Sequence, residues 1–155
     1  MIGVIIQARM SSKRLPGKIM ADIKGQPMLA HVLHRAGNIP GVDFVGIATT
    51  LDTADDLVVQ FAQTSRIPVF RGDEQDVLDR FYQSAKEWSA TTILRITADC
   101  PILDPAIAGK VLERYISACG RLDYVSNNHP PTFPDGLDTE VFSFSALEQA
   151  WKEAR

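Results

Sequence analysis

The sequence predicts an α/β fold with a mainly parallel sheet, and three observations lead to this prediction. Short β-branched apolar runs alternate with longer segments whose apolar residues recur at helical spacing. Pro and Gly stand at the ends of helical segments, where they favour starts and stops. The 155 residues are 45% hydrophobic and 23% charged, as in an ordinary globular protein. We therefore expect a single domain over residues 1–155, with helices covering the sheet.

The first half of the chain predicts three strands, each followed by a helix. The apolar run at 4–6 is typical of a buried strand, and the polar stretch that follows predicts a loop. Pro27 and Gly37 fit the start and the stop of the first helix. The predicted elements are a strand at 4–6, a helix at 28–36, a strand at 43–50, a helix capped by Thr53 that continues through Ala62, a strand at 67–70, and a helix opened by Asp73 or Glu74.

The second half continues the same alternation and then changes to short strands. Asp104 and Pro105 are typical of a helix start, with proline in the first turn. The predicted elements are a strand at 91–97, a helix from Pro105 through Ile116, strands at 122–127 and 139–144, and a helix capped by Ser145 that runs to Arg155. This last helix reaches the end of the sequence without a helix-breaking residue. We therefore expect the intact protein to continue beyond residue 155.

Charge is unevenly distributed along the chain. The net charge is −3, yet residues 1–35 contain six basic side chains and one acidic one, and four of the basic ones lie within 9–18. This pattern favours a small anionic ligand over nucleic acid or an anionic membrane. No apolar run approaches the length of a membrane span, no basic leader precedes the first strand, and Cys100 and Cys119 lack metal-site spacing. We expect a cytoplasmic protein with reduced thiols.

The basic loop at 9–18 has the residue types that a phosphate site requires. Small residues such as Ser11, Ser12 and Gly17 allow backbone N–H groups to approach phosphate oxygens. Arg14 can bind two oxygens at once, and Lys13 and Lys18 supply point charges. The loop matches neither the Walker A pattern nor G-x-G-x-x-G. A solvated charged loop is the alternative interpretation.

A second polar motif, Thr97 to Pro101, follows the predicted strand at 91–97. Ligands of parallel α/β sheets lie beyond the carboxyl ends of the strands, so this motif and the basic loop are expected at one edge. Asp99 suits Mg²⁺, which usually takes one or two protein carboxylates together with substrate phosphates. The alternative is an aspartate that caps a turn. Nothing in the sequence marks Cys100 as a nucleophile.

A long, proline-rich polar segment at 127–140 is the third candidate. Loops of this length inside compact domains are often functional. Three acids, Asp135, Asp138 and Glu140, could supply a second metal ligand or bind the hydroxyl groups of a sugar. The alternative interpretation is a surface loop, stiffened by proline, that has no role in binding. The acids at 73–79 are interpreted as helix-start and surface residues. Residues 71–73 follow a predicted strand, however, and could line a ligand-binding cleft at the ends of the strands.

Four ordered motifs resemble the cytidylyltransferase family, which includes CMP-KDO synthetases, acylneuraminate cytidylyltransferases and the spore-coat polysaccharide protein SpsF group. Residues 5–18 are similar to the opening of the family, and Gln7 is typical of the SpsF branch. Residues 71–81 and 95–101 resemble its second conserved stretch and the segment that ends in the metal aspartate. Residues 133–142 are again similar to the SpsF branch. The resemblance covers essentially the whole chain. Family members are usually longer, so the resemblance suggests either an N-terminal catalytic portion or a member truncated at its C-terminus.

The resemblance implies a three-layer α/β/α, Rossmann-like nucleotide-diphospho-sugar transferase fold with a mixed, mainly parallel sheet. It also implies CTP as the nucleotide donor, Mg²⁺ as the cofactor and a sugar or sugar acid as the acceptor; dimers are common in the family. Asp99 would hold Mg²⁺, and the second metal aspartate of the synthetases has no clear counterpart. The residues implied for nucleotide binding are Ala8, Arg9, Ser11, Ser12, Lys13, Arg14, Lys18 and Arg71.

The implied reaction is in-line attack of an acceptor hydroxyl on the α-phosphorus of CTP, with release of pyrophosphate. Arg14 and Lys18 would neutralise the charge that develops on the leaving group. One alternative is a glycosyltransferase of the related fold, but Thr97-Ala98-Asp99 lacks the first acid of the D-x-D pair typical of those enzymes. The other alternative is a nucleotide-binding module without catalytic activity.

Overall fold

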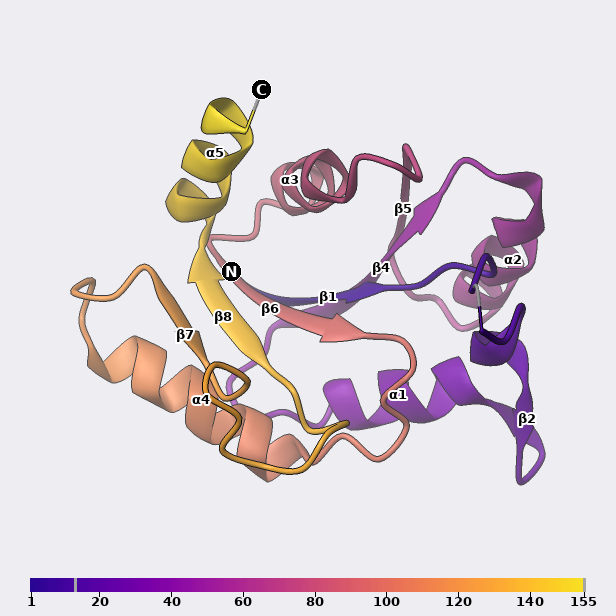
Figure 1. The fold of residues 1–155 in the computed structure, drawn as a ribbon, viewed down its shortest axis with the longest axis horizontal. Coiled ribbons are helices and arrows are strands. Elements are labelled where there is room, and N and C mark those ends of the chain that lie inside the picture. Colours follow the sequence, from indigo (N-terminus) through magenta and orange to yellow (C-terminus); the bar gives the residue numbers. More distant parts are fainter. Residues whose placement is uncertain (13, 155) are drawn as a thin grey trace.

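A six-stranded sheet forms the centre of the computed structural model, which describes residues 1–12 and 14–154 (Figure 1). Four strands are parallel and lie in the order β5, β4, β1, β6. The sheet continues through β8, which is antiparallel to both β6 and β7. The strand bounds are β1 Ile2–Gln7, β4 Phe44–Thr50, β5 Val69–Gly72, β6 Thr92–Thr97, β7 Tyr124–Ser126 and β8 Glu140–Ser143. The predicted mixed, mainly parallel sheet is confirmed.

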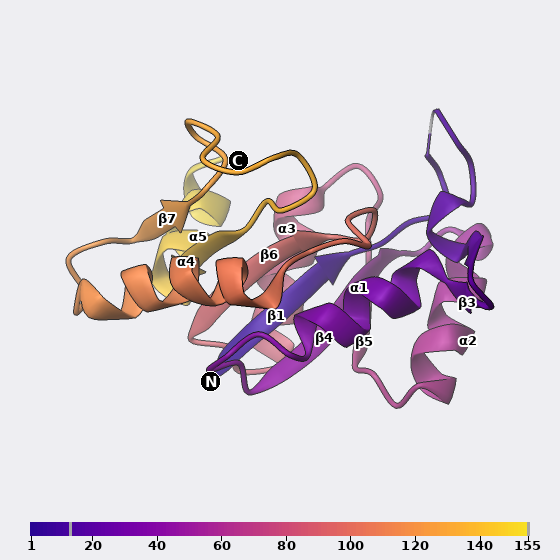
Figure 2. The same ribbon diagram turned by 90° about the horizontal axis from the view of Figure 1, so that it is seen from below.

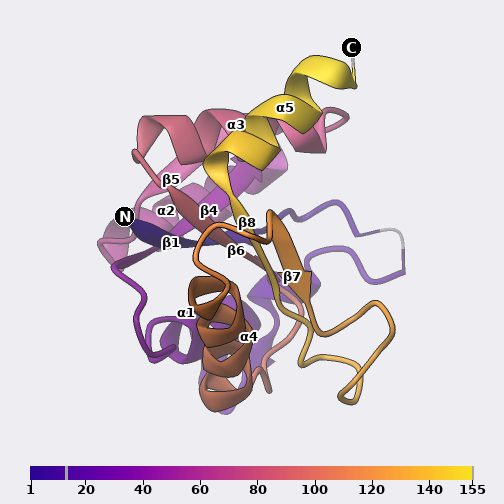
Figure 3. The same ribbon diagram turned by 90° about the vertical axis from the view of Figure 1, so that its left-hand side faces the viewer.

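Helices cover both faces of this sheet, as Figures 1 and 3 show. Side chains alternate along β1, so Val4 and Ile6 pack in one core while Ile5 packs in the other. The first core also contains residues of α1 (Met28–Ala36), α2 (Asp56–Thr64) and α4 (Pro105–Ser117). The second contains residues of α3 (Val77–Glu87) and α5 (Phe144–Glu153). The three-layer α/β/α arrangement predicted from the sequence is therefore present.

Several predicted boundaries are wrong, mostly because a different polar residue caps the helix. The 3₁₀ turn Thr53–Asp55 that precedes α2 is capped by the side chain of Asp52 rather than Thr53. Asp76 caps α3 in place of Asp73 or Glu74, and Ser143 caps α5 in place of Ser145. The strand predicted at 67–70 is shifted to β5, and those predicted at 122–127 and 139–144 are shorter. Helix α5 is described to Glu153, and Arg155 lies outside the described residues.

The topology brings three loops to one edge of the sheet. Gln7, near the end of β1, lies opposite Ala48 of β4 and Thr97 of β6, so the parallel strands finish together. Because β8 runs the other way, its first residue, Glu140, pairs with Arg95 near the same edge. The basic loop and the orange β7–β8 loop project on the same side in Figures 2 and 3. Small elements follow the basic loop, namely a 3₁₀ turn Lys18–Met20, β2 Asp22–Ile23 and β3 Gln26–Pro27.

Within the described residues, none of the helices combines the length and the apolar character that crossing a membrane requires.

Candidate functional site

A hollow of about 340 Å³ lies at this edge, between the basic loop and the end of β6. The basic loop supplies most of the predicted nucleotide-binding side chains that line it, and β6 is followed by Asp99. The lining residues include Gln7, Arg9, Ser12, Arg14, Lys18, Thr97 and Asp99. The two motifs that the sequence placed at one edge are thus in the same hollow.

A second hollow of about 520 Å³ adjoins the first and shares Arg14, Thr97 and Asp99 with it. Asp135 and Asp138 of the β7–β8 loop form part of its lining, together with the Cys100–Ile102 turn. Two of the three acids predicted to bind substrate are therefore within this hollow. The shared residues place Asp99 and Arg14 where ligands in the two hollows would meet.

Glu140, the third predicted acid, is engaged in the sheet. Its Oε1 accepts hydrogen bonds from Arg95 Nη1 at 2.7 Å and from Asn128 Nδ2 at 3.0 Å. These contacts tie the start of β8 to β6 and to the β7–β8 loop. The structure thus gives Glu140 a role in holding the loop that carries Asp135 and Asp138.

Lys18 and Asp99 form the ion pair of the first hollow, with Nζ 2.5 Å from Oδ2. Burial alone would raise the pKa of Asp99, but hydrogen bonds from Lys18 and Thr97 outweigh it and lower the pKa below its ordinary value. The Asp99 side chain remains 38% exposed, so its carboxylate faces the hollow. Burial raises the pKa of the neighbouring Cys100 thiol, which favours its neutral form.

The backbone of Met10 organises the basic loop. Its carbonyl accepts hydrogen bonds from Ser12 N at 2.8 Å and Gly17 N at 2.9 Å, which brings the two ends of the loop together. Gly17 adopts φ +73°, a conformation that L side chains rarely take. The N–H of Met10 donates to Asp55 Oδ1 at 2.7 Å. The backbone of Met10 is therefore held through both its N–H and its carbonyl.

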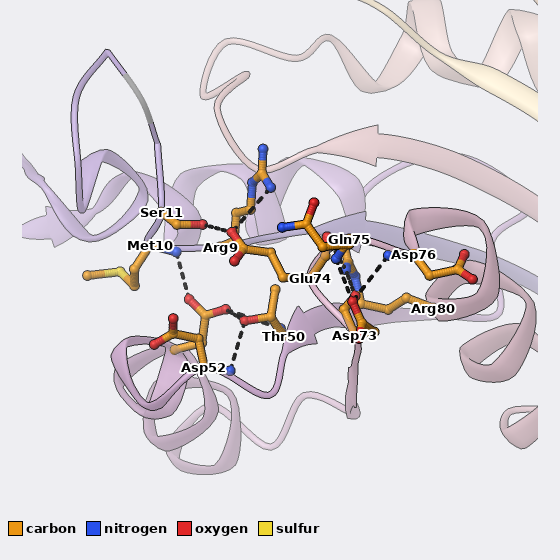
Figure 4. A network of polar contacts seen from close by, with 11 residues as sticks. Arg9, Met10, Ser11, Thr50, Asp52, Asp73, Glu74, Gln75, Asp76 and Arg80 are labelled. Carbon is orange, nitrogen blue, oxygen red and sulfur yellow. Dashed lines mark hydrogen bonds and ion pairs between the residues drawn. The ribbon is translucent and has the colours of Figure 1, made fainter.

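Glu74 holds the side chains of the same loop (Figure 4). Ser11 Oγ donates to Glu74 Oε1, and Arg9 Nη1 lies 3.4 Å from the same oxygen. The turn that carries Glu74 rests on Arg80, whose Nη1 donates to the Asp73 carbonyl at 2.5 Å. Arg80 is fully buried, and its burial, reinforced by nearby Arg9, lowers the pKa of its guanidinium. The interpretation of Glu74 as a surface acid is incomplete, because it contacts the site.

Sequence reasoning missed the contribution of Asp55, Glu74 and Arg80. For Glu74 and Arg80 a signal was available, since both lie within the 71–81 stretch that carries the family resemblance. For Asp55 the residue type alone favoured a helix-start role. Its contact with Met10 spans 45 positions in the chain and is created by the fold.

The remaining predicted nucleotide-binding residues are Ala8, Lys13 and Arg71. Ala8 is buried, and its N–H extends the β1–β4 pairing by donating to the Ala48 carbonyl at 3.1 Å. Lys13 lies outside the described residues. The Arg71 guanidinium donates to the carbonyls of Thr50 and Asp52 and to the Asp56 carboxylate. These contacts hold α2 against β4 and β5, so the arrangement gives no support to Arg71 as a nucleotide contact.

The donor set at Asp99 is compatible with Mg²⁺. Among residues 1–12 and 14–154, no group of three or more His, Cys, Asp or Glu side chains could hold a metal ion. A single half-exposed carboxylate between two hollows suits Mg²⁺ instead, because this ion commonly takes most of its ligands from substrate phosphates and water.

Comparison with known proteins identifies the class to which this fold and site belong. A family model described as "Cytidylyltransferase" matches residues 3–155. The chain therefore belongs to the cytidylyltransferase family, as its four motifs predicted.

Relatives in sequence are consistent with this assignment. The chain is 38% identical over 151 residues to an uncharacterized protein of Methanocaldococcus jannaschii, covering 97% of this chain and 60% of the relative. It is 32% identical over 147 residues to the spore coat polysaccharide biosynthesis protein SpsF of Bacillus subtilis, covering 92% and 59%. A 3-deoxy-manno-octulosonate cytidylyltransferase of Rhodopseudomonas palustris is 35% identical over 114 residues, covering 71% and 45%. The chain thus spans about three-fifths or less of the length of these relatives.

Solved structures give the same result for the fold. A cytidylyltransferase from Leptospira borgpetersenii superposes with a TM-score of 0.94 at 33% identity, covering 99% of this chain and 65% of that one. A CMP:2-keto-3-deoxy-manno-octonic acid synthetase complexed with CTP superposes with a TM-score of 0.78 at 20% identity, covering 99% and 78%. The second similarity establishes the fold alone, which is the one predicted from the sequence.

Proposed function

We propose that this chain carries the catalytic portion of an enzyme that transfers CMP from CTP to a sugar or sugar acid with release of pyrophosphate. The observation that carries the proposal is the position of Arg14 and Asp99, which line both hollows at the ligand edge of the sheet. Transfer between two bound substrates requires such a junction, because the reacting atoms must be held close together. Membership of the cytidylyltransferase family supports the choice of nucleotide.

The first hollow is proposed to bind CTP. Its triphosphate would contact the side chains of Arg9, Ser11, Ser12, Arg14 and Lys18, with Lys13 as a further cation of the same loop. Arg14 can grip two oxygens at once, whereas Lys18 acts as a point charge. Ala8 and Arg9 are proposed to lie beside the base. Charge that builds on the leaving pyrophosphate would then be neutralised by Arg14 and Lys18.

Asp99, at the junction of the two hollows, is proposed as the residue that would hold Mg²⁺. When bound, Mg²⁺ supplies Lewis-acid stabilisation of charge on the phosphoryl oxygens. Lys18 lies 2.5 Å from the Asp99 carboxylate. Hydrogen bonding from Lys18 and Thr97 lowers the pKa of Asp99, which favours the ionised form that binds a cation.

The second hollow is proposed to bind the acceptor. Asp135 and Asp138 would accept hydrogen bonds from hydroxyl groups of a sugar, and Glu140 would position their loop through Arg95. The oxygen of an acceptor hydroxyl attacks the α-phosphorus, a new P–O bond forms, the bond to pyrophosphate breaks, and the hydroxyl proton is released to water. The name of the SpsF relative supports a role in cell-surface or spore-coat polysaccharide biosynthesis, and the name of the 3-deoxy-manno-octulosonate cytidylyltransferase supports a sugar acid as the acceptor. We propose a cytoplasmic location, where CTP is available. We also propose a homodimer, which gel filtration can test.

A pyrophosphate-release assay tests the proposal. Each of the four common nucleoside triphosphates is supplied with Mg²⁺ and a panel of sugar acids and neutral sugars. Pyrophosphate release that requires both CTP and one acceptor supports cytidylyl transfer. Release of a nucleoside diphosphate from a sugar nucleotide would identify a glycosyltransferase instead. Tight CTP binding without turnover on any acceptor would indicate a nucleotide-binding module.

A further inference from the structure

We propose that Asp55 is a positioning residue for the basic loop, acting through the backbone N–H of Met10. The proposal rests on the proposed function, because the loop matters for catalysis only if it binds a nucleotide. Asp55 lies in the 3₁₀ turn between β4 and α2, outside the four motifs that the sequence singled out for chemistry. Asp55 holds the loop through a backbone group, so this contact does not occupy the loop side chains that are proposed to bind the ligand.

The first step is the burial of an acidic side chain. Asp55 is only 1% exposed, and removing a carboxylate from water is costly unless hydrogen bonds compensate. Its Oδ1 accepts from Met10 N at 2.7 Å, and its Oδ2 accepts from the N–H of Thr50 at 3.1 Å and from the Thr50 hydroxyl. A carboxylate that only accepts matches three donors. The buried Asp55 carboxylate therefore joins the basic loop, through Met10, to the end of β4, through Thr50.

The second step is that the side chain of Asp55 makes no capping hydrogen bond to its own helix. It stands at the N-cap of α2, where aspartate usually accepts a hydrogen bond from the helix backbone, but its side chain makes no such contact. The preceding turn is capped by Asp52, which accepts from Ala54 N at 2.8 Å. Helix initiation thus explains Asp52 and leaves Asp55 unexplained. The hydrogen bonds of its side chain come from the end of β4 and from the basic loop.

The third step concerns which part of the loop is held. The Met10 carbonyl accepts hydrogen bonds from Ser12 N and Gly17 N, so the position of the Met10 backbone sets the position of the closed loop. Arg14 lies within the closed segment, and Lys18 follows it directly. Figure 4 shows Met10 and Thr50 each joined by a dashed line to the same carboxylate. Asp55 therefore fixes the loop cations relative to β4, a central strand of the sheet.

Amide hydrogen exchange in the basic loop tests this tether directly, with no nucleotide present. We expect Asp55→Ala to accelerate exchange at Ser12 and Gly17 by about tenfold while the amides of β6 remain protected. Thr50→Val is the matched control, because it disturbs the same buried carboxylate but leaves the bond to Met10 in place; its loop exchange should stay near the wild-type value. Equal acceleration in both variants, or no acceleration in Asp55→Ala, would overturn the proposal.

A second pair of variants covers the case in which Asp55→Ala does not fold. Met10→Pro removes the same N–H donor from the loop side, whereas Met10→Leu keeps it. We expect the faster loop exchange in Met10→Pro alone. If Met10→Pro and Met10→Leu exchange alike, Asp55 does not hold the loop.

Calorimetric titration with CTP and Mg²⁺ then connects the tether to the site. Asp55→Ala should raise the Kd for CTP by about tenfold, Asp55→Asn, which retains one acceptor oxygen, should recover most of the affinity, and Thr50→Val should bind as the wild type does. Loss of affinity that simply follows the loss of melting temperature in all three variants would mean a structural role only. A wild-type protein that binds no nucleotide would refute the proposed function, while hydrogen exchange would still decide on the tether.

Discussion

Asp55 and Asp99 both lie at the edge of the sheet where the parallel strands end, Asp55 after β4 and Asp99 after β6. They differ in their exposure to solvent and in the groups that they bind. Asp55, after β4, is buried and receives hydrogen bonds from uncharged groups of Met10 and Thr50. Asp99, after β6, is 38% exposed and is paired with the ammonium group of Lys18. The contacts of Asp55 are shielded from solvent, whereas those of Asp99 face a hollow that an anionic or cationic ligand can enter. Exposure thus separates a carboxylate that sets geometry from one that can exchange partners with a ligand.

The largest loss of activity is expected at the exposed aspartate, Asp99. Asp99→Ala should reduce CTP-dependent pyrophosphate release by about 1000-fold, because the charge-stabilising group at the junction is lost. Its melting temperature should remain within about 2 °C of the wild type, since an exposed pair contributes little to folding. The assay of both quantities in Glu113→Ala, an exposed acid on α4, is the control. Undiminished turnover in Asp99→Ala would remove Asp99 from the mechanism.

Replacing the partner of Asp99 should have the next largest effect. Lys18→Met keeps the length of the side chain but removes its charge, so we expect a loss of about 100-fold in kcat/KM for CTP. Lys110→Met on α4 removes the same charge from an exposed helix position far along the chain. If both lysine variants lose activity to the same extent, the effect is one of overall charge, and the role assigned to Lys18 is wrong.

A smaller effect, in the opposite direction, is expected at Glu74. This carboxylate contacts Arg9 and Ser11, two of the side chains proposed for the triphosphate, and its ion pair with Arg9 is partly exposed. Glu74→Gln should therefore lower the Kd for CTP by about two- to fivefold, since a competing negative charge is removed. Glu87→Gln, an exposed position on α3, controls for the change in net charge. Weaker binding in Glu74→Gln would show that Glu74 supports the ligand-bound loop instead.

The smallest effect concerns the pH dependence of stability. The pKa of Asp99 is lowered in the folded state, so its ion pair stabilises the protein fully above the unfolded pKa of about 3.9 and loses this contribution as the pH falls through the folded value. Because the side chain is 38% exposed, we expect a contribution below about 1 kcal/mol. Denaturant unfolding of wild type and Asp99→Asn should differ by a constant amount from pH 8 to pH 5 and converge below pH 4. A difference that instead grows as the pH falls would contradict this assignment.

The fold was predictable because it depends on patterns that are local in the sequence. The β-branched run at 4–6 and the apolar spacing at 28–36 each identify an element without knowledge of its neighbours. The helix caps were less predictable. Ser143 and Ser145 are both suitable capping residues only two positions apart, and the register of β8 decides between them.

The site was predictable where one loop supplied several residues and unpredictable where the fold joined distant ones. The cations of 9–18 and the carboxylate of Asp99 carry their chemistry in their residue types, and the parallel topology requires them to meet. Asp55 and Glu74 are ordinary acids in the sequence. They become part of the site only because the ends of β4 and β5 lie next to the basic loop. Asp55 contacts Met10 across 45 positions of the chain, and Glu74 contacts Ser11 across 63.

The reversed direction of β8 places the proposed acceptor side of the site on a different loop from most of the proposed nucleotide side. A parallel strand would need a long crossover to return to this edge, whereas β7 and β8 form an antiparallel pair whose connection already lies there. Both ends of that connection are fixed in the sheet, through Ser126 and Glu140. The segment between them is therefore a natural position for grafting. If the second hollow binds the acceptor as proposed, we expect exchange of residues 127–139 among relatives to change which acceptor reacts while the affinity for CTP stays the same.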